Sequence, residues 1–303
     1  MKKGITKMLS VCVFAFVVFL AAGTESKAAT TNMGLKQTNA GSSYVNLAWD
    51  AQLGAGHYHT QFSQDGKNWI DMDDSSSPSE SVYNLTQGAS YYARVVAYKD
   101  SHYMGTHVMV GVSETAIVST KPAEVTGLTQ TAAGVNSVSM SWNASAGAAS
   151  YVIYGYINYN WTQIGTSATN SATITGVAAT TSTRFSVAAV KNVTGGTVTG
   201  DQCSGVEMKA IPIKVSRIAM QYYWDSLKEA KYIWTDVNNA DGYQYEVKSA
   251  NGKKTYFRAT STSSYTYVKP FPRGIFVKAR VRAYVTVGNK VYYGAWSPYT
   301  YHA

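Results

Sequence analysis

Cysteine is scarce in this chain, and its scarcity excludes one way of stabilising a fold. Of the two cysteines, Cys12 lies in an apolar N-terminal segment, so Cys203 alone would remain once that segment is removed. A single cysteine cannot form an internal disulfide, and the paired cysteines of a zinc site are missing as well. Each folded unit must therefore be stabilised by an apolar core, in which we expect Cys203 to be a small buried residue.

Motifs that carry chemistry are also missing. The sequence contains no Gly-x-Ser-x-Gly, no glycine-rich phosphate loop and no His-Glu-x-x-His. Acidic residues are few, and the acidic run Asp71-Met-Asp-Asp74 lacks the glycine and the distal glutamate of a calcium loop. We therefore expect a protein that is not an enzyme and that needs no cofactor.

The N-terminus has the layout of a secretory signal peptide. Lys2, Lys3 and Lys7 precede an apolar stretch that is shorter than the roughly 20 residues needed to cross a bilayer, and Ser26-Lys-Ala28 offers a cleavage site. This short, lysine-rich leader is of a bacterial kind. We expect residues 1–28 to be removed and the mature protein, without a transmembrane segment, to be secreted. Because the last residues hold no apolar tail or sorting motif, any retention at the cell surface is expected to be noncovalent.

One signature occurs three times at a nearly constant interval. Trp49, Trp142 and Trp234, each in an alternating run, lie 93 and 92 residues apart. A second alternating run begins at residues 91, 183 and 277, at intervals of 92 and 94. Two landmarks with one period indicate three tandem domains of about 90 residues. With the prolines of Lys121-Pro122 and Ile211-Pro212 as junctions, the predicted domains are residues 29–121, 122–211 and 212–303.

The pattern within each unit is that of β-strands. In Val277-Lys-Ala-Arg-Val-Arg-Ala-Tyr-Val285 every odd position is apolar, and a period of two places these side chains on one face of a sheet. Turn clusters such as Ser63-Gln-Asp-Gly-Lys67 and Ser249-Ala-Asn-Gly-Lys253 supply the positive φ values of tight hairpins. Several short strands in each unit predict an all-β chain of three immunoglobulin-like β-sandwiches.

The landmarks together resemble a known family. The first unit has Trp49, the aromatic-rich run His57-Tyr-His-Thr-Gln-Phe62, and Leu85 six residues before Tyr91. On these residues each unit resembles a fibronectin type III domain. The second and third units depart from the pattern, because Thr183 and Val277 stand where Tyr91 does. The resemblance implies that Tyr91 ties its strand to the backbone and that the other two units lack this bond. It also implies a binding domain or spacer and assigns no chemistry.

Histidines gather in the first unit. If Tyr58, Thr60 and Phe62 face the core, His57 and His59 point outward together. His102 and His107 follow in the loop expected at the same end of the sandwich. Since imidazole is a ligand for zinc and copper, His57, His59, His102 and His107 are a candidate metal site. The alternative is a set of exposed polar residues with no shared partner.

Positive charge gathers in the third unit. Its 14 Lys and Arg oppose 5 Asp and Glu, whereas the first unit has 5 against 8 and the second 3 against 3. Alternation places Lys278, Arg280, Arg282 and Tyr284 on the outward face of one strand, beside Gln244, Glu246 and Lys248 of the neighbouring strand. The candidate ligand-binding residues are Lys248, Lys253, Lys254, Tyr256, Arg258, Lys278, Arg280, Arg282 and Tyr284.

Such a face attracts polyanions. An exported protein meets anionic cell-wall polymers and acidic polysaccharides before it meets nucleic acid, so we expect one of the former, with protein partners a further possibility and nucleic acid not expected. The sequence therefore predicts a non-catalytic binding or adhesion protein. The alternative is a passive extracellular spacer or assembly subunit with no ligand of its own.

Overall fold

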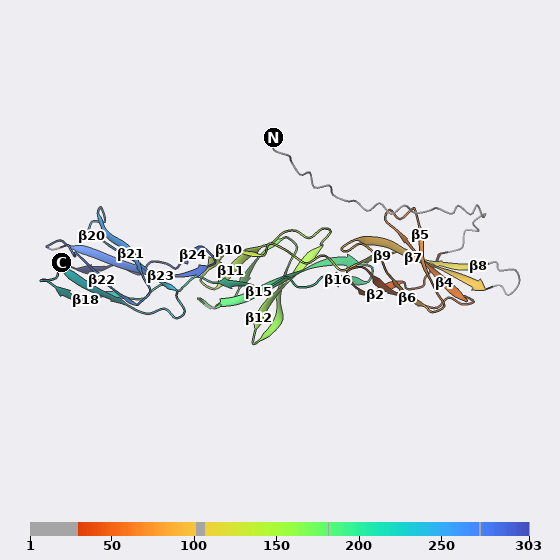
Figure 1. Cartoon of the computed structure of the whole chain (residues 1–303), viewed down its shortest axis with the longest axis horizontal. Helices are drawn as coiled ribbons and strands as arrows, with labels where there is room; N and C mark the ends of the chain where they lie inside the picture. Colours follow the sequence, from red (N-terminus) through yellow and green to blue (C-terminus); the bar gives the residue numbers. More distant parts are fainter. Residues whose placement is uncertain (1–29, 101–106, 181, 273, 303) are drawn as a thin grey trace, which may run out of the picture.

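The computed structural model describes residues 30–100, 107–180, 182–272 and 274–302. Three sandwiches, here called the first, second and third domains, follow one another end to end (Figure 1). Every element among the described residues is a β-strand, and this part of the chain has no helix long and apolar enough to span a membrane. The signal peptide predicted at 1–28 and His102 lie outside the described residues.

The first domain pairs β2, β3 and β6 in one sheet and orders the other β1-β8-β7-β4-β5, with β9 also pairing with β7. Its strands are β1 (Thr30–Thr31), β2 (Lys36–Ala40), β3 (Val45–Ala48), β4 (His57–Ser63), β5 (Ile70–Ser75), β6 (Ser79–Val82), β7 (Ser90–Asp100), β8 (His107–Ser113) and β9 (Ala116–Ser119).

The second domain repeats this arrangement, with β10-β11-β14 opposite β13-β12-β15-β16, and with β17 also pairing with β15. Its strands are β10 (Thr129–Gly134), β11 (Ser137–Ser141), β12 (Ser150–Ile157), β13 (Asn160–Ser167), β14 (Ser171–Thr175), β15 (Ser182–Val193), β16 (Gly196–Thr199) and β17 (Val206–Lys209).

The third domain places β18-β19-β22 opposite β21-β20-β23-β24, with β25 also pairing with β23. Its strands are β18 (Ile218–Trp224), β19 (Glu229–Trp234), β20 (Gly242–Ser249), β21 (Thr255–Ser261), β22 (Tyr265–Val268), β23 (Val277–Val287), β24 (Lys290–Tyr293) and β25 (Thr300–His302). The prediction of three tandem β-sandwiches is confirmed, while the exact boundaries after residues 121 and 211 stay predictions.

A buried tryptophan and a tyrosine form the same pair in each core. The two rings pack against each other at an angle, with centroids 5.4, 5.3 and 5.4 Å apart. The tyrosine hydroxyl accepts a hydrogen bond from the backbone N–H six residues earlier, at 3.0, 3.0 and 2.8 Å. The pair therefore joins the two sheets and ties down the loop between them. The pairs are Trp49–Tyr58, Trp142–Tyr151 and Trp234–Tyr243.

The corner before β7 carries the bond expected from the sequence. The Tyr91 hydroxyl accepts a hydrogen bond from the backbone N–H of Thr86 at 3.0 Å. Val277, at the corresponding position of the third domain, has no hydroxyl to form this bond.

In every domain a small buried residue forms a bridge, through a side-chain hydrogen bond, to the backbone of the long strand β7, β15 or β23. Ser113 accepts a hydrogen bond from the Val95 N–H at 2.9 Å, and the third domain has the equivalent bond to Ser297 at 3.0 Å. Cys203 has this role in the second domain, where its sulfur lies 3.2 Å from the amide nitrogen of Val187. The prediction of a buried Cys203 is confirmed, and its sulfur replaces the usual serine oxygen.

The hairpin between the last long strands of one domain packs against the preceding domain. At the first junction the Thr194 N–H donates to the Ile117 carbonyl at 2.8 Å, and the Lys191 ammonium donates to a carbonyl of the first domain. At the second junction Lys290 donates to the Thr131 carbonyl at 3.1 Å, and Lys209 pairs with Asp241 at 3.1 Å. Direct contacts at both junctions favour an extended, restrained arrangement.

We expect the serine and cysteine bridges to differ in their tolerance of substitution. Ser297→Ala leaves the buried Val281 N–H without its acceptor and should lower the free energy of unfolding by about 1–3 kcal/mol. Cys203→Ser keeps an acceptor in place and should change it by less than about 1 kcal/mol. Urea denaturation of the full chain measures both effects. Equal losses in the two variants would contradict the equivalence of these positions.

Candidate functional site

The predicted basic residues lie on the outward face of the sheet β21-β20-β23-β24. In β23 the odd-numbered residues from Val277 to Val285 are buried, and the residues between them point away from the core. The pairing of β20 with β23 sets Lys248 opposite Lys278, Glu246 opposite Arg280, and Gln244 opposite Arg282. We call this surface, with the turn that joins β20 to β21, the basic face.

Glu246 lies at the centre of the basic face and is completely covered by its neighbours. Its carboxylate accepts from Arg258 at 2.6 Å and from Arg280 at 2.6 Å, and it pairs with Lys248 at 3.1 Å. Burial by itself would raise the pKa of Glu246. The hydrogen bonds from Arg258, Lys248 and Arg280 and the charge of Arg280 outweigh burial and lower the pKa from 4.5 to about 2. Glu246 is therefore a buried counter-ion that holds three cations in place.

Aromatic rings from the last segment of the chain lie between the cations of β23. The Lys278 nitrogen lies 4.7 Å from the centre of the Tyr299 ring, and the Arg280 guanidinium lies 4.9 Å from Tyr299 and 4.4 Å from Trp296. The next guanidinium, Arg282, lies 4.5 Å from Trp296 and 3.9 Å from Tyr293. Cation and ring thus alternate along the strand, which restricts each arginine to one position.

The cations of this ladder are among the predicted site residues, but its three rings, Tyr293, Trp296 and Tyr299, are not. Trp296 and Tyr299 follow β24 in a segment with no period of two, so alternation assigns them to neither face. The recurrence of an aromatic residue every three positions, at Tyr293, Trp296 and Tyr299, is the sequence signal that marks these rings. Tyr284, predicted to line the face, packs edge-on against Tyr293 with ring centroids 5.8 Å apart.

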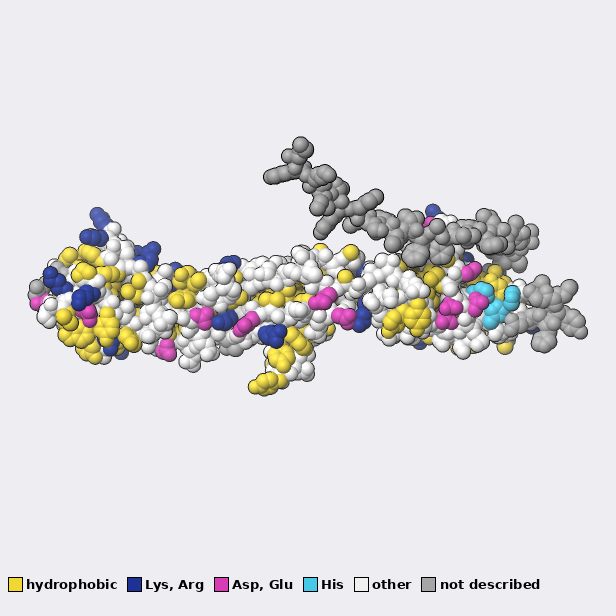
Figure 2. All heavy atoms as spheres, in the orientation of Figure 1, with side chains coloured by type: hydrophobic (Ala, Val, Ile, Leu, Met, Phe, Trp, Pro, Cys, Tyr) yellow, Lys and Arg dark blue, Asp and Glu magenta, His cyan; other side chains and the backbone are white. Residues whose placement is uncertain are grey.

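The solvent-exposed cations of the basic face are Lys253, Lys254 and Arg258. Lys253 and Lys254 lie at the turn from β20 to β21, and Lys254 lies 4.9 Å from the centre of the Tyr256 ring. Figure 2 shows Lys and Arg side chains standing out at this end of the molecule. Among the described residues Glu246 is the carboxylate that pairs with this set, so the face retains an excess of positive charge.

The histidines of the first domain form a cluster at the far end of the molecule (Figure 2). The ring centroids of His57 and His107 are 4.7 Å apart and those of His57 and His59 are 5.2 Å apart. His59 Nε2 lies 3.2 Å from Asp74, beside an open hollow of about 340 Å³. Within the described ranges no three histidine, cysteine or carboxylate side chains are arranged to hold a metal ion.

The zinc or copper site at His57, His59, His102 and His107 therefore stays a prediction. The structure brings three of its four residues together and does not describe the fourth. Titration of zinc into the chain would check it, through a heat of binding that His59→Ala removes.

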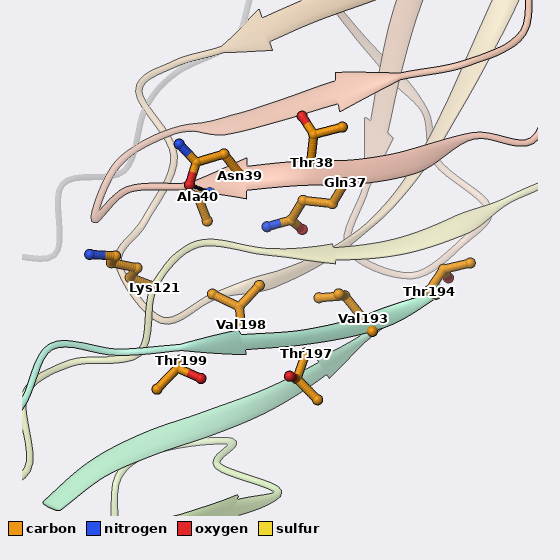
Figure 3. A pocket seen from close by; sticks show the side chains of 12 residues that line it. Gln37, Thr38, Asn39, Ala40, Lys121, Val193, Thr194, Thr197, Val198 and Thr199 are labelled. Atoms are coloured by element: carbon orange, nitrogen blue, oxygen red, sulfur yellow. Dashed lines mark hydrogen bonds between the residues drawn. The ribbon is translucent and has the colours of Figure 1, made fainter. Parts of the chain in front are cut away.

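A second hollow, of about 320 Å³, lies between the first two domains. Figure 3 shows residues of β2, among them Gln37, above the gap and Val193 and Val198 of the β15–β16 hairpin below it. Gln37 exchanges two hydrogen bonds with the Ser119 backbone, both at 2.8 Å, and Val198 packs against the core of the first domain. This hollow is a feature of the junction and contains Lys121 as its one charged lining residue.

No family model matches the sequence, and no curated protein matches it. Among solved structures, the chain is similar to the FN1-FN3 domains of chicken CNTN1, with 16% identity and a TM-score of 0.37 over 89% of this chain and 97% of that one. It is also similar to a segment of two fibronectin type III domains from chicken tenascin, with 15% identity and a TM-score of 0.31 over 58% of this chain and 97% of that one.

The strand order within each sandwich defines the class of protein. A sheet of the first, second and fifth main strands faces a sheet of the third, fourth, sixth and seventh, in all three domains. The chain is a tandem array of three fibronectin type III-like sandwiches, and this fold by itself assigns no activity.

The pKa of Glu246 predicts how the third domain responds to acid. Because the folded-state pKa is below the unfolded value, Glu246 contributes stability above about pH 4.5 and loses that contribution as the pH falls toward 2. The loss is of the order of 3 kcal/mol. Urea denaturation of the chain at pH 5 and pH 2 measures it.

The matched control is Glu246→Gln, which cannot titrate. This variant is less stable at pH 5, because the three cations lose their counter-ion. Its stability should then fall less than that of the wild type between pH 5 and pH 2. An equal fall in the two proteins would contradict the assignment.

Proposed function

We propose that this chain is an extracellular, non-catalytic binding or adhesion protein whose third domain contacts an anionic cell-wall polymer or acidic polysaccharide. The observation that carries the proposal is the basic face, which holds seven lysines and arginines, while the carboxylate of Glu246 pairs with three of them. The predicted signal peptide supports export, and export brings the protein to polymers of this charge.

The rigidity of the basic face supports binding of a polymer rather than loose attraction. The ladder of cations and rings immobilises Arg280 and Arg282 before any ligand arrives, so less side-chain entropy is lost on binding. The exposed Lys253 and Lys254 add charge that can follow a flexible chain. Binding through these lysines would release counter-ions and weaken as salt rises.

The alternative function is that of a spacer without a ligand of its own. The contacts at both junctions favour it, because they restrain the three domains in an extended arrangement. A spacer and a binder differ in one measurable respect, which is retention by a polyanion.

We expect the mature chain to be retained on immobilised heparin and on purified cell walls at low salt. Lys253→Gln/Lys254→Gln should elute at lower salt, and the slope of log affinity against log salt should become less steep by up to about two units. The matched control, Lys36→Gln/Lys67→Gln, removes two exposed charges from the first domain and should elute with the wild type. Equal weakening in the two variants, or no retention of the wild type on either material, would refute the basic face and leave the spacer.

A further inference from the structure

Four aromatic rings lie on the outward face of β18, β19 and β22, on the opposite side of the third domain from the basic face. Tyr222, Trp224, Tyr265 and Tyr267 are 44%, 36%, 44% and 48% exposed. Figure 2 shows hydrophobic side chains gathered at the end of the molecule where Figure 1 places β18 and β22. We call these four rings, with Lys231 of β19, the aromatic platform.

A break in strand register builds this platform. β18 and β19 pair antiparallel, with Met220 opposite the buried Tyr232, and the register then shifts so that Tyr222 lies opposite Lys231. Gln221 is the extra residue, and a bulge of this kind reverses which side chains point outward. Without this bulge, the side chains of Tyr222 and Trp224 would point toward the core, as that of Met220 does. On the other side of β19, Lys231 lies opposite Tyr267.

The rings form one connected surface around a cation. The centroids of Tyr222 and Trp224 are 4.9 Å apart, those of Trp224 and Tyr267 are 6.2 Å apart, and those of Tyr265 and Tyr267 are 5.9 Å apart. The Lys231 nitrogen lies 5.1 to 5.8 Å from the centres of three tyrosine rings. No carboxylate of the described chain pairs with Lys231, so its positive charge lacks an acidic partner.

The fold does not require aromatic residues on this face. In the second domain the equivalent central pair is Ser139 and Thr173, whose hydroxyls are 2.9 Å apart, and in the first it is Asn46 and Ser81. Both of those domains have the same bulge in their first main strand. The four rings are also not part of the apolar core of the third domain. Exposed, contiguous aromatic surface that packing does not explain indicates a contact site.

We propose that the aromatic platform binds an acidic polysaccharide, whose sugar rings stack on Tyr222, Trp224, Tyr265 and Tyr267 while an acidic group pairs with Lys231. Charge complementarity selects this occupant, because a neutral or apolar partner would leave the central ammonium of Lys231 desolvated without a counter-charge. The spacing of neighbouring rings is comparable with the repeat of one pyranose unit, and the open face of a rigid sheet suits an extended chain. This site is separate from the basic face and does not depend on it.

Affinity electrophoresis of the mature chain tests the site, with polygalacturonate, alginate and hyaluronate as probes in the gel. Trp224→Ala/Tyr267→Ala should bind at least one of these probes at least tenfold more weakly than the wild type does, and the difference should persist at high salt because stacking is not screened. Tyr83→Ala/Tyr92→Ala, which removes two exposed rings of the first domain, should bind like the wild type. Unchanged thermal unfolding of the variants keeps the comparison valid.

The role of Lys231 has its own readout. The wild type should bind the methyl-esterified, neutral form of the retained polymer more weakly than the acidic form, and Lys231→Gln should weaken binding to the acidic form without weakening binding to the neutral form. Including Lys253→Gln/Lys254→Gln separates the two sites, because that variant tests the basic face alone and its loss of binding should disappear at high salt.

Three results would overturn the platform. One is the absence of any retention that depends on Trp224 and Tyr267 across the three probes. Another is an equal loss in Tyr83→Ala/Tyr92→Ala. The third is self-association of the wild type in analytical ultracentrifugation that Trp224→Ala/Tyr267→Ala abolishes, because the face would then be an interface between two copies of the chain. None of these results bears on the basic face.

Discussion

The antiparallel pairing of β20 with β23 holds the third domain together and arranges one of its surfaces. This pairing directs Val277, Val281 and Val285 into the core. The same register sets Glu246 opposite Arg280 on the outward side. A register shift of one residue would exchange these two sets, placing arginines in the core and valines in water. The basic face is therefore as firmly determined as the core, because one set of backbone hydrogen bonds specifies both. The pairs β4–β7 and β12–β15 do the same in the other domains.

The two outward faces of the third domain differ in whether their aromatic rings or their cations are exposed. On the basic face the rings of Trp296 and Tyr299 are used internally, since they separate and immobilise arginines, and the charge that remains available is largely on exposed lysines. On the aromatic platform the rings themselves remain exposed around the single cation of Lys231. One face is suited to salt-sensitive attraction and the other to stacking. Both lie in the domain at one end of an extended chain (Figure 1).

Much of the fold and part of the site could be predicted from the sequence, because both depend on local patterns. The period of two placed Arg280 beside Glu246, the repeat placed three sandwiches in tandem, and Tyr91 had the backbone bond that its position implied. The missed residues share a physical reason. Trp296 and Tyr299 belong to an irregular segment, and Tyr222 and Trp224 follow a bulge, so in both places alternation no longer indicates which way a side chain points.

By itself, the sequence determined the number of domains, the class of fold and the concentration of cations in the third domain, because repeats, alternation and composition are properties of the chain. Tertiary structure decided how those residues are used. It buried Glu246 beneath three cations, placed rings between Arg280 and Arg282, and gathered Tyr222, Trp224, Tyr265 and Tyr267 around Lys231. These arrangements join residues from strands distant in the sequence, and their contacts exist only once the register and bulges of the paired strands are set.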